Sequence, residues 1–292
     1  MNPNFYCVGT QKAGTTKVFD ILKSHPEVFL PENKEEHFFD NDLNFEKGID
    51  WYINNYFQNV ENQKVVGGFT PCYLYFPYCA QRIYETYGES TKILIILRNP
   101  MERGYSQYLM SKRRGYEELE FLDACEQEMS RITNSFQSKE RFSYISRGMY
   151  YEQVQRYLTL FGAHNVLILK YEQLFSRANF ESEFNKIFDF LGIQKIDVDI
   201  TSRSNMAAEP KLKFVRNIVF KENFVKKLAK KVVYNPKLRS LIRNKIEVLN
   251  TKPISEKISE DDKKFLYKQY FAQDIENLET LIDMDFTEWK IK

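Results

Sequence analysis

The sequence has little of the chemistry that builds disulfide frameworks or metal sites. Its 292 residues include only four cysteines and three histidines. The cysteines form no CxxC pair and have no zinc-site spacing; they are Cys7, Cys72, Cys79 and Cys125. The sequence therefore predicts no metal site and favours a reduced, intracellular compartment.

Long apolar runs are also missing. No run approaches the roughly 20 residues that span a bilayer, and no hydrophobic leader precedes the first expected strand, which begins within a few residues of Met1. We therefore expect a cytoplasmic protein without a transmembrane segment. Internal repeats and low-complexity linkers are lacking too, and we expect a single domain over residues 1–292.

A large excess of one charge is absent from the chain as a whole. Lys and Arg number 42 against 40 Asp and Glu, a net charge of +2, which argues against a nucleic-acid-binding protein. The exception is residues 211–245, where twelve basic residues stand against Glu222, a net +11 that leaves −9 for the rest. Two interpretations stay open: a solvated helical face, or a basic surface that covers an anionic ligand or rests on anionic lipid headgroups.

Apolar and aromatic residues are abundant, with 24 Phe and 19 Tyr among the 43% hydrophobic residues. Apolar runs and helical spacing alternate over residues 1–192, which predicts an α/β fold of three layers, P-loop-like, with a central, mainly parallel sheet flanked by helices. Residues 205–292 are expected to form a helical, basic C-terminal part. Strands are expected at 5–9, 65–69, 92–97 and 166–170, with a short one after a helix stop within 24–31. Helices are expected to begin at 15 and to occupy 45–60, 77–87, 101–110, 116–135, 148–162, 180–191 and 259–282.

The loop after the first expected strand has the features of an anion site. An apolar run ends at Gly9, and helical spacing restarts at Thr15 and Thr16. A helix start presents free backbone N–H groups, and Lys12 lies beside them, so the loop favours a phosphate. The alternative is an ordinary turn between strand and helix whose lysine is solvated.

The spacing of this loop differs from that of an ATP-binding loop. Gly9 and Gly14 have the Gly-x4-Gly spacing, but Thr15 stands where a Walker A loop has its lysine. The strand at 92–97 ends in Arg98 where a Walker B strand has a metal-binding aspartate. The loop therefore suits a nucleotide phosphate rather than a magnesium-held triphosphate.

Three segments resemble the sulfotransferases that use 3′-phosphoadenosine-5′-phosphosulfate (PAPS), most strongly the carbohydrate branch with its heparan-sulfate-type enzymes. They are the loop 11–16, the strand end 96–106 and the turn 34–39. Weaker similarities occur at 147–150, at 170–174 and at Trp289, so the resemblance spans most of the chain.

The resemblance implies a set of donor-binding residues. The loop would hold the 5′-phosphosulfate through Lys12, Ala13, Gly14, Thr15 and Thr16. Arg98 and Ser106 would hold the 3′-phosphate, for which a planar guanidinium and a hydroxyl are suitable donors. Two anion sites on neighbouring turns match a ligand with phosphates at both ends of a ribose. The alternative for Arg98 is a salt bridge at the edge of the sheet.

The resemblance also implies the catalytic roles. Lys12 would offset charge on the leaving phosphate oxygen, and Glu35 would be the general base. Glu36 and His37 are alternatives, since His37 is the better base by its intrinsic pKa, and Glu35 as a solvated turn carboxylate stays open. Lys34, His37 and Tyr73 are expected to bind substrate.

The expected function is therefore that of a metal-independent sulfotransferase that moves a sulfuryl group from PAPS to a hydroxyl of a carbohydrate or glycolipid. Relatives often have a charged residue just before the Thr-Pro-x-Tyr turn, whereas Gly68 and Phe69 precede Thr70 here, so the acceptor contacts stay open. The alternatives are a P-loop nucleotide kinase, a sulfotransferase for a non-sugar small molecule, and a binding protein without catalysis.

Overall fold

The computed structural model describes residues 2–32, 34–132, 135–198, 208–210, 251–253 and 257–291. The basic segment 211–245 lies outside the described residues, and its role stays a prediction. The chain divides into two compact units: Met1–Arg103 with Arg147–Ser204 and Lys264–Lys292, and Gly104–Ser146 with Asn205–Lys263. The single domain expected over 1–292 also stays a prediction.

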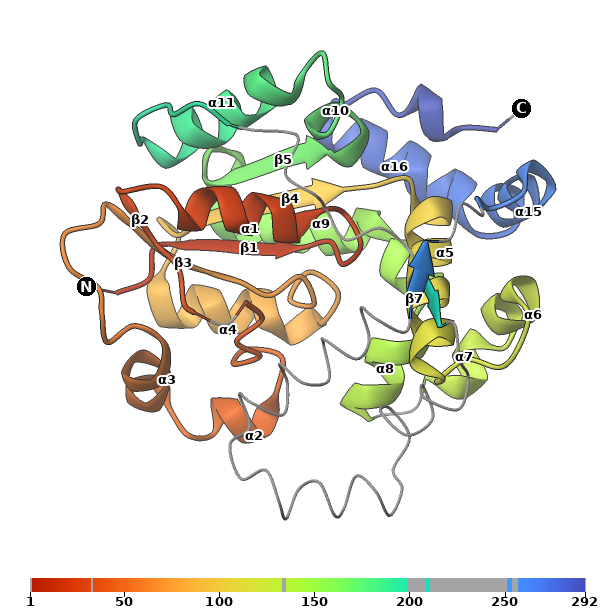
Figure 1. Ribbon diagram of the computed structural model, residues 1–292, viewed down its shortest axis with the longest axis horizontal. Helices are drawn as coiled ribbons and strands as arrows, with labels where there is room; N and C mark the ends of the chain where they lie inside the picture. The colour runs from red at the N-terminus through yellow and green to blue at the C-terminus, as the bar shows by residue number, and fades with distance from the viewer. Residues whose placement is uncertain are drawn as a thin grey trace. The chain divides into compact units, whose positions relative to one another are not determined.

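The first unit is built on a five-stranded sheet with the order β2-β3-β1-β4-β5 (Figure 1). Every neighbouring pair is parallel. The central strands are buried along their length, which explains their near-continuous apolar runs. The strands are β1 (Phe5–Gly9), β2 (Val28–Phe29), β3 (Val65–Phe69), β4 (Lys92–Leu97) and β5 (Val166–Lys170).

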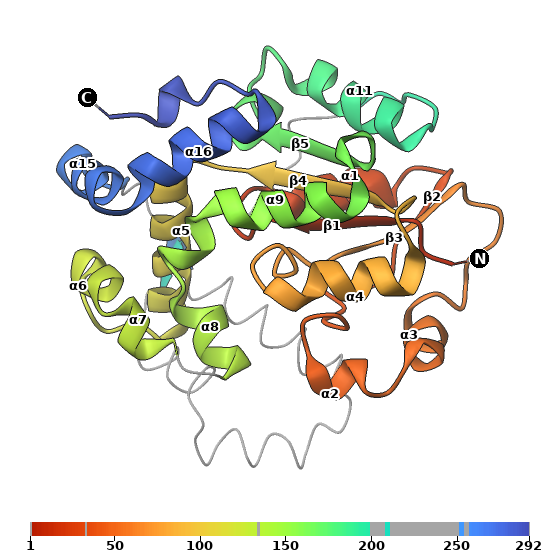
Figure 2. The ribbon, with the colours of Figure 1, turned by 180° about the vertical axis from the view of Figure 1, so that it is seen from behind.

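Helices cover both faces of this sheet, which confirms the predicted three-layer, P-loop-like fold. Helices α1 (Thr15–Lys23) and α11 (Phe180–Leu191) pack on one face and share its apolar core. Helices α4 (Pro77–Tyr87), α9 (Tyr150–Phe161) and α16 (Ala272–Ile282) lie on the other face (Figure 2). The expected stripe on α11 is buried, and the helix ends at Gly192 with a φ of 70°.

Shorter helices complete the first unit. They are α2 (Asp42–Phe45), α3 (Ile49–Tyr56), α10 (Tyr171–Leu174) and the 3-10 turns Ala163–Asn165 and Thr287–Trp289. The expected helix at 45–60 is thus α3, shorter than predicted. The expected helix at 259–282 is interrupted, because a π-helical turn at Tyr267–Phe271 separates α15 (Glu260–Leu266) from α16. In the described residues no helix is both long and apolar enough to cross a membrane.

The second unit contains α6 (Phe121–Glu126), α7 (Glu128–Arg131), α8 (Phe136–Phe142) and an antiparallel pair, β6 (Ala208–Pro210) with β7 (Thr251–Pro253). Helix α5 (Pro100–Arg114) has residues in both units. The single helix predicted over 116–135 is wrong. Glu117 is buried, its carboxylate accepts the N–H groups of Glu118 and Leu119 and pairs with Arg131, and the segment becomes helical only at Phe121, the first residue of α6.

Candidate active site

The loop between β1 and α1 is built so that the helix start remains open. Gly14 is the N-cap of α1 in a left-handed conformation (φ 73°), and no side chain caps the helix. A Cβ atom on Gly14 would lie 2.3 Å from the ring of Phe175, so both conformation and space require glycine. The uncapped first turn can therefore receive an anion, as the sequence predicts.

The two predicted phosphate elements meet at Lys12. Its backbone is left-handed (φ 75°), and its carbonyl oxygen accepts a hydrogen bond of 3.1 Å from Nη1 of Arg98. The loop is also tied to the neighbouring strand, since the N–H of Thr10 donates to the carbonyl of Ile96 at 2.9 Å. Residues 86 positions apart, Lys12 and Arg98, thus lie at one place at the carboxyl edge of the sheet.

Arg98 has further partners beside the loop. Its Nη2 lies 3.3 Å from Oε2 of Glu102, and its guanidinium lies 4.6 Å from the ring centroid of Tyr171. Among the described residues its buried Nε has no hydrogen-bond partner. The predicted sheet-edge salt bridge and the contact with the loop therefore occur together, and the guanidinium retains a donor with which an anion would fit.

The turn at 34–40 lies against the same loop. The N–H of Glu35 donates to the carbonyl of Phe69 at the end of β3 (3.0 Å). Nζ of Lys34 lies 3.3 Å from Oγ1 of Thr15 and 3.1 Å from Oε1 of Glu35. The lysine therefore links the first residue of α1 to the predicted base, whose side chain is 38% exposed.

His37 and Asp40 extend this arrangement. Nδ1 of His37 lies 2.9 Å from Oδ2 of Asp40, whose side chain is buried. Nε2 of His37 lies 3.8 Å from Oε2 of Glu35, which is too long for a hydrogen bond. Asp40 thus orients the imidazole with its other nitrogen toward Glu35.

Glu36, the other acidic candidate for the base, faces inward. It is buried, and its Oε2 accepts the hydroxyl of Thr70 at 2.7 Å while its Oε1 accepts the N–H of Phe69 at 3.3 Å. Burial raises the pKa of Glu36, against the lowering effect of these hydrogen bonds. Glu36 therefore holds the turn against the end of β3, and the geometry gives it this structural role instead of the role of general base.

Tyr73 and Ser106 are the remaining predicted site residues. Tyr73, expected to bind substrate, is buried, and its hydroxyl accepts the N–H of Phe38 at 3.1 Å. The hydroxyl thus supports the turn at 34–40, and acceptor binding by Tyr73 stays a prediction. Ser106 belongs to the second unit, on α5, and its predicted role in donor binding stays a prediction.

Two residues that the sequence did not single out complete the surroundings of Arg98. Tyr171 supplies the ring beneath its guanidinium. Oε1 of Glu172 accepts the N–H of Asn99 at 2.9 Å, and burial raises the pKa of this carboxyl. In the sequence, these two residues were marked only by the weak similarity at 170–174, which indicated no role for either side chain.

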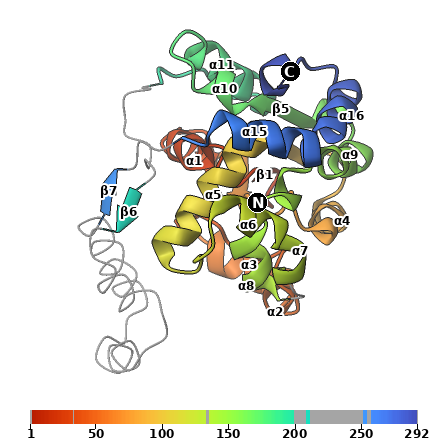
Figure 3. The ribbon, with the colours of Figure 1, turned by 90° about the vertical axis from the view of Figure 1, so that its right-hand side faces the viewer.

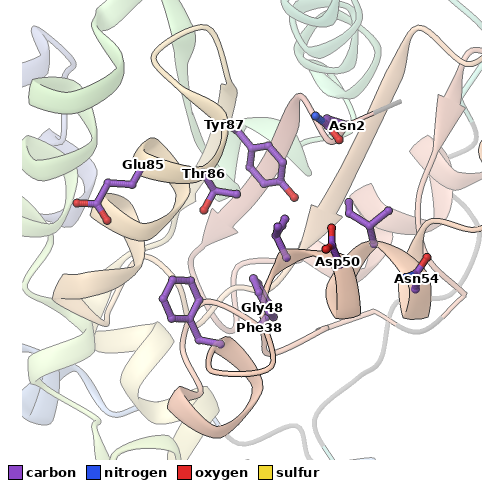
Figure 4. Close-up of a pocket in the computed structure, with 11 residues that line it drawn as sticks. Asn2, Phe38, Gly48, Asp50, Asn54, Glu85, Thr86 and Tyr87 are labelled. Carbon is purple, nitrogen blue, oxygen red and sulfur yellow. The ribbon is translucent and has the colours of Figure 1, made fainter.

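A cavity in the first unit is separate from these residues. It has a volume of about 740 Å³ and is lined by residues that include Asn2, Phe38, Asp50 and Tyr87 (Figure 4). None of the predicted site residues lines it. In the described part of the chain, no group of three or more His, Cys, Asp or Glu residues is arranged to hold a metal ion.

Comparisons with known proteins connect this geometry to a family. The chain is 24% identical over 273 residues to the membrane-associated sulfotransferase kil1 of Dictyostelium discoideum, covering 67% of this chain and 57% of that protein. It is 28% identical over 199 residues to human heparan sulfate glucosamine 3-O-sulfotransferase 3B1, covering 68% and 48%. The chain thus spans about half the length of the curated relatives it matches.

A solved structure agrees over nearly the whole chain. The crystal structure of a sulfotransferase from Alicyclobacillus acidocaldarius superposes with a TM-score of 0.71 at 25% identity, covering 99% of both chains. The sequence profile of the family described as "Sulfotransferase domain" matches residues 2–232. The chain therefore belongs to the sulfotransferase domain family.

Proposed function

We propose that this chain transfers a sulfuryl group from PAPS to a hydroxyl of a carbohydrate or glycolipid acceptor and releases adenosine 3′,5′-bisphosphate. The hydrogen bond from Arg98 to the carbonyl of Lys12 is the observation that carries the proposal. It brings the two predicted phosphate elements together, while Lys34 brings Glu35 to the start of α1.

The residues present fit the donor. The uncapped start of α1, with Lys12, Ala13, Gly14, Thr15 and Thr16, would hold the 5′-phosphosulfate. Arg98, with its remaining Nε donor, would hold the 3′-phosphate. When bound, PAPS supplies a sulfuryl group on a phosphate leaving group. Binding rests on backbone N–H groups and cationic side chains, and the proposal keeps the predicted independence of metal.

The proton of the acceptor hydroxyl goes to Glu35. The bond from the acceptor oxygen to sulfur forms as the bond from sulfur to the phosphate oxygen breaks. Lys12 and the N–H groups of α1 offset the charge that develops on that oxygen. The ion pair with Lys34 orients the Glu35 carboxylate. Asp40 holds the imidazole of His37 beside that carboxylate. A positioned base of this kind is worth about 10²–10⁴-fold in rate.

A glycan acceptor is supported by the relatives named as heparan sulfate glucosamine 3-O-sulfotransferases. We also propose a cytoplasmic location, which the four free cysteines support. Lys34 and His37 lie on either side of Glu35 and are the proposed acceptor contacts.

A thermal unfolding scan tests the donor. Adenosine 3′,5′-bisphosphate without magnesium is expected to stabilise the protein, by about 2.7 kcal/mol at a hundredfold excess over its dissociation constant. ATP with magnesium is expected to have no comparable effect. Stabilisation by ATP with magnesium alone would contradict the proposal and favour the kinase. Transfer of labelled sulfate from PAPS to a panel of glycans and small phenols then tests the acceptor class, and no transfer to any glycan would refute it.

A further inference from the structure

The backbone carbonyl of Arg98 is held by a tyrosine hydroxyl from another helix. We infer that Tyr150 is a positioning residue for Arg98, and that the C-terminal helix α16 holds Tyr150 in place through Asp274. The inference rests on the proposed function, since it assigns these residues to the binding of the donor's 3′-phosphate.

The first observation is a hydrogen bond to the backbone of Arg98. Oη of Tyr150 donates to the carbonyl oxygen of Arg98 at 2.8 Å, and the tyrosine is fully buried. The pairing of β4 with β5 ends at Leu97, so the sheet ladder does not hold this carbonyl. Pro100 lacks an N–H and also ends the strand. The hydroxyl of Tyr150 therefore gives the carbonyl of Arg98 the hydrogen bond that the pairing of β4 with β5 does not supply.

The other backbone groups of this turn are also satisfied by side chains. The N–H of Asn99 donates to Glu172 at 2.9 Å, and Oδ1 of Asn99 accepts the N–H of Met101 at 3.1 Å at the start of α5. The orientation of Arg98 is thus set by Tyr150 and Glu172, from α9 and α10, rather than by the regular sheet. A small rotation of this turn would move the guanidinium away from the carbonyl of Lys12.

The second observation is the carboxylate that fixes Tyr150. Asp274 accepts the N–H of Tyr150 at 2.7 Å and that of Tyr151 at 3.2 Å. The N-cap residue of α9, Met149, makes no side-chain cap. Asp274 therefore caps α9 from the neighbouring helix α16, where a negative charge is favourable. The two helices lie side by side (Figures 2 and 3).

The third observation is the tight packing around Gly148, just before α9. A Cβ atom there would lie 3.0 Å from Cβ of Pro100 and 3.1 Å from the ring of Phe271. The starts of α5, α9 and α16 therefore meet at one point without room for a side chain. The ring of Tyr150 also lies 6.1 Å from that of Trp289, near the C-terminal end of the described chain.

Helix α16 lies beyond the part of the chain that the family profile matches, which ends at residue 232. The contacts described above nevertheless join it, through one aspartate and one tyrosine, to the turn that presents Arg98. A segment near the C-terminal end of the described chain therefore supports the turn that presents Arg98.

The test compares Tyr150→Phe with Tyr151→Phe. The first variant removes only the hydroxyl on Arg98, whereas the hydroxyl of Tyr151 contacts Gln155 at an exposed position and serves as the matched control. We expect Tyr150→Phe to weaken binding of adenosine 3′,5′-bisphosphate about tenfold, the effect of one buried hydrogen bond, and to raise the KM for PAPS but not for the acceptor. Tyr151→Phe should leave all three unchanged.

A second nucleotide separates positioning from a general loss of structure. Adenosine 5′-monophosphate lacks the 3′-phosphate, so Tyr150→Phe should leave its affinity unchanged. Equal losses for both nucleotides, or no loss for either, would overturn the inference. If the wild-type protein binds neither nucleotide, the proposed function fails instead.

Asp274 provides an independent variant. Asp274→Ala removes the cap and should weaken bisphosphate binding as much as Tyr150→Phe does. Asp274→Asn keeps an oxygen that can accept the N–H groups, so it should bind the bisphosphate as tightly as the wild-type protein does. Unchanged bisphosphate affinity in a folded Asp274→Ala protein would remove α16 from the inference, even where Tyr150→Phe fails to fold.

Discussion

The buried carboxyl of Asp274 leads to a quantitative prediction about stability and pH. The residue is 7% exposed. Burial raises its pKa from the usual 3.8 to about 6, and the N–H groups of Tyr150 and Tyr151 only partly oppose the rise. The folded protein therefore binds a proton at Asp274 more readily than the unfolded chain does.

The direction of the effect follows from this difference in proton binding. Between pH 4 and pH 6 the folded state holds the proton while the unfolded chain has released it, so the free energy of unfolding falls as pH rises. A change in pKa from 3.8 to about 6 corresponds to a loss of about 3 kcal/mol, at about 1.4 kcal/mol per pH unit. Above pH 6 this contribution is constant.

The perturbation is Asp274→Asn, which keeps an oxygen for the N–H groups but does not titrate. Other carboxyls have shifted pKa values too, among them Glu172, whose pKa is raised by burial. The stability difference between variant and wild type removes these shared contributions. That difference should shift in favour of the variant by about 2–2.5 kcal/mol from pH 4 to pH 7, because the unfolded carboxyl is still partly protonated at pH 4.

Urea unfolding at one-unit steps from pH 4 to pH 8 measures the difference. Gln273→Ala, at an exposed position on the same helix, changes no titratable group, so it is the matched control and should show a constant difference. A difference for Asp274→Asn that stays constant across this range would refute the reasoning, because it would mean that Asp274 ionises alike in the folded and unfolded states.

Three further variants address the candidate site. Glu35→Gln should lower turnover by about 10²–10⁴-fold with bisphosphate affinity unchanged, as measured by labelled-sulfate transfer and calorimetry; unchanged turnover would favour a binding protein. Lys12→Ala should reduce turnover more than it weakens bisphosphate binding, and equal losses would restrict the lysine to binding. Gly14→Ala should destabilise the protein by more than about 1–3 kcal/mol, because a left-handed conformation and a clash at 2.3 Å add together. Gly192→Ala, equally left-handed but in open space, isolates the first effect in the same unfolding assay.

The sheet and its large helices were predictable because each is encoded locally. Strand β4 is a run of five apolar residues after Lys92, and α11 shows apolar residues at every fourth position. The described part of the segment 116–135 contains two short helices instead of one long helix, and the first begins only at Phe121. Before it, the buried carboxylate of Glu117 binds the two following N–H groups and Arg131, and helical spacing carries no information about such contacts.

The roles of Glu35 and Glu36 show the same limit within the site. The two residues are chemically alike and adjacent, yet one is part exposed beside the loop and the other is buried against Thr70. The backbone is left-handed at Glu35 (φ 70°) and at His37 (φ 49°), which turns the side chains of Glu35 and Glu36 in different directions. Neither position has a glycine to signal such a turn, so only the resemblance favoured Glu35.

The two sequence interpretations of Arg98, a sheet-edge salt bridge and a phosphate ligand, are compatible in the structure. The pair with Glu102 at 3.3 Å is partly exposed, and such pairs contribute only about 0–1 kcal/mol. A doubly charged phosphate competes readily for the same guanidinium, so the carboxylate can orient Arg98 without preventing ligand binding. The position of the guanidinium depends instead on backbone contacts to residues distant in sequence, Lys12 and Tyr150, which no local pattern around Arg98 encodes.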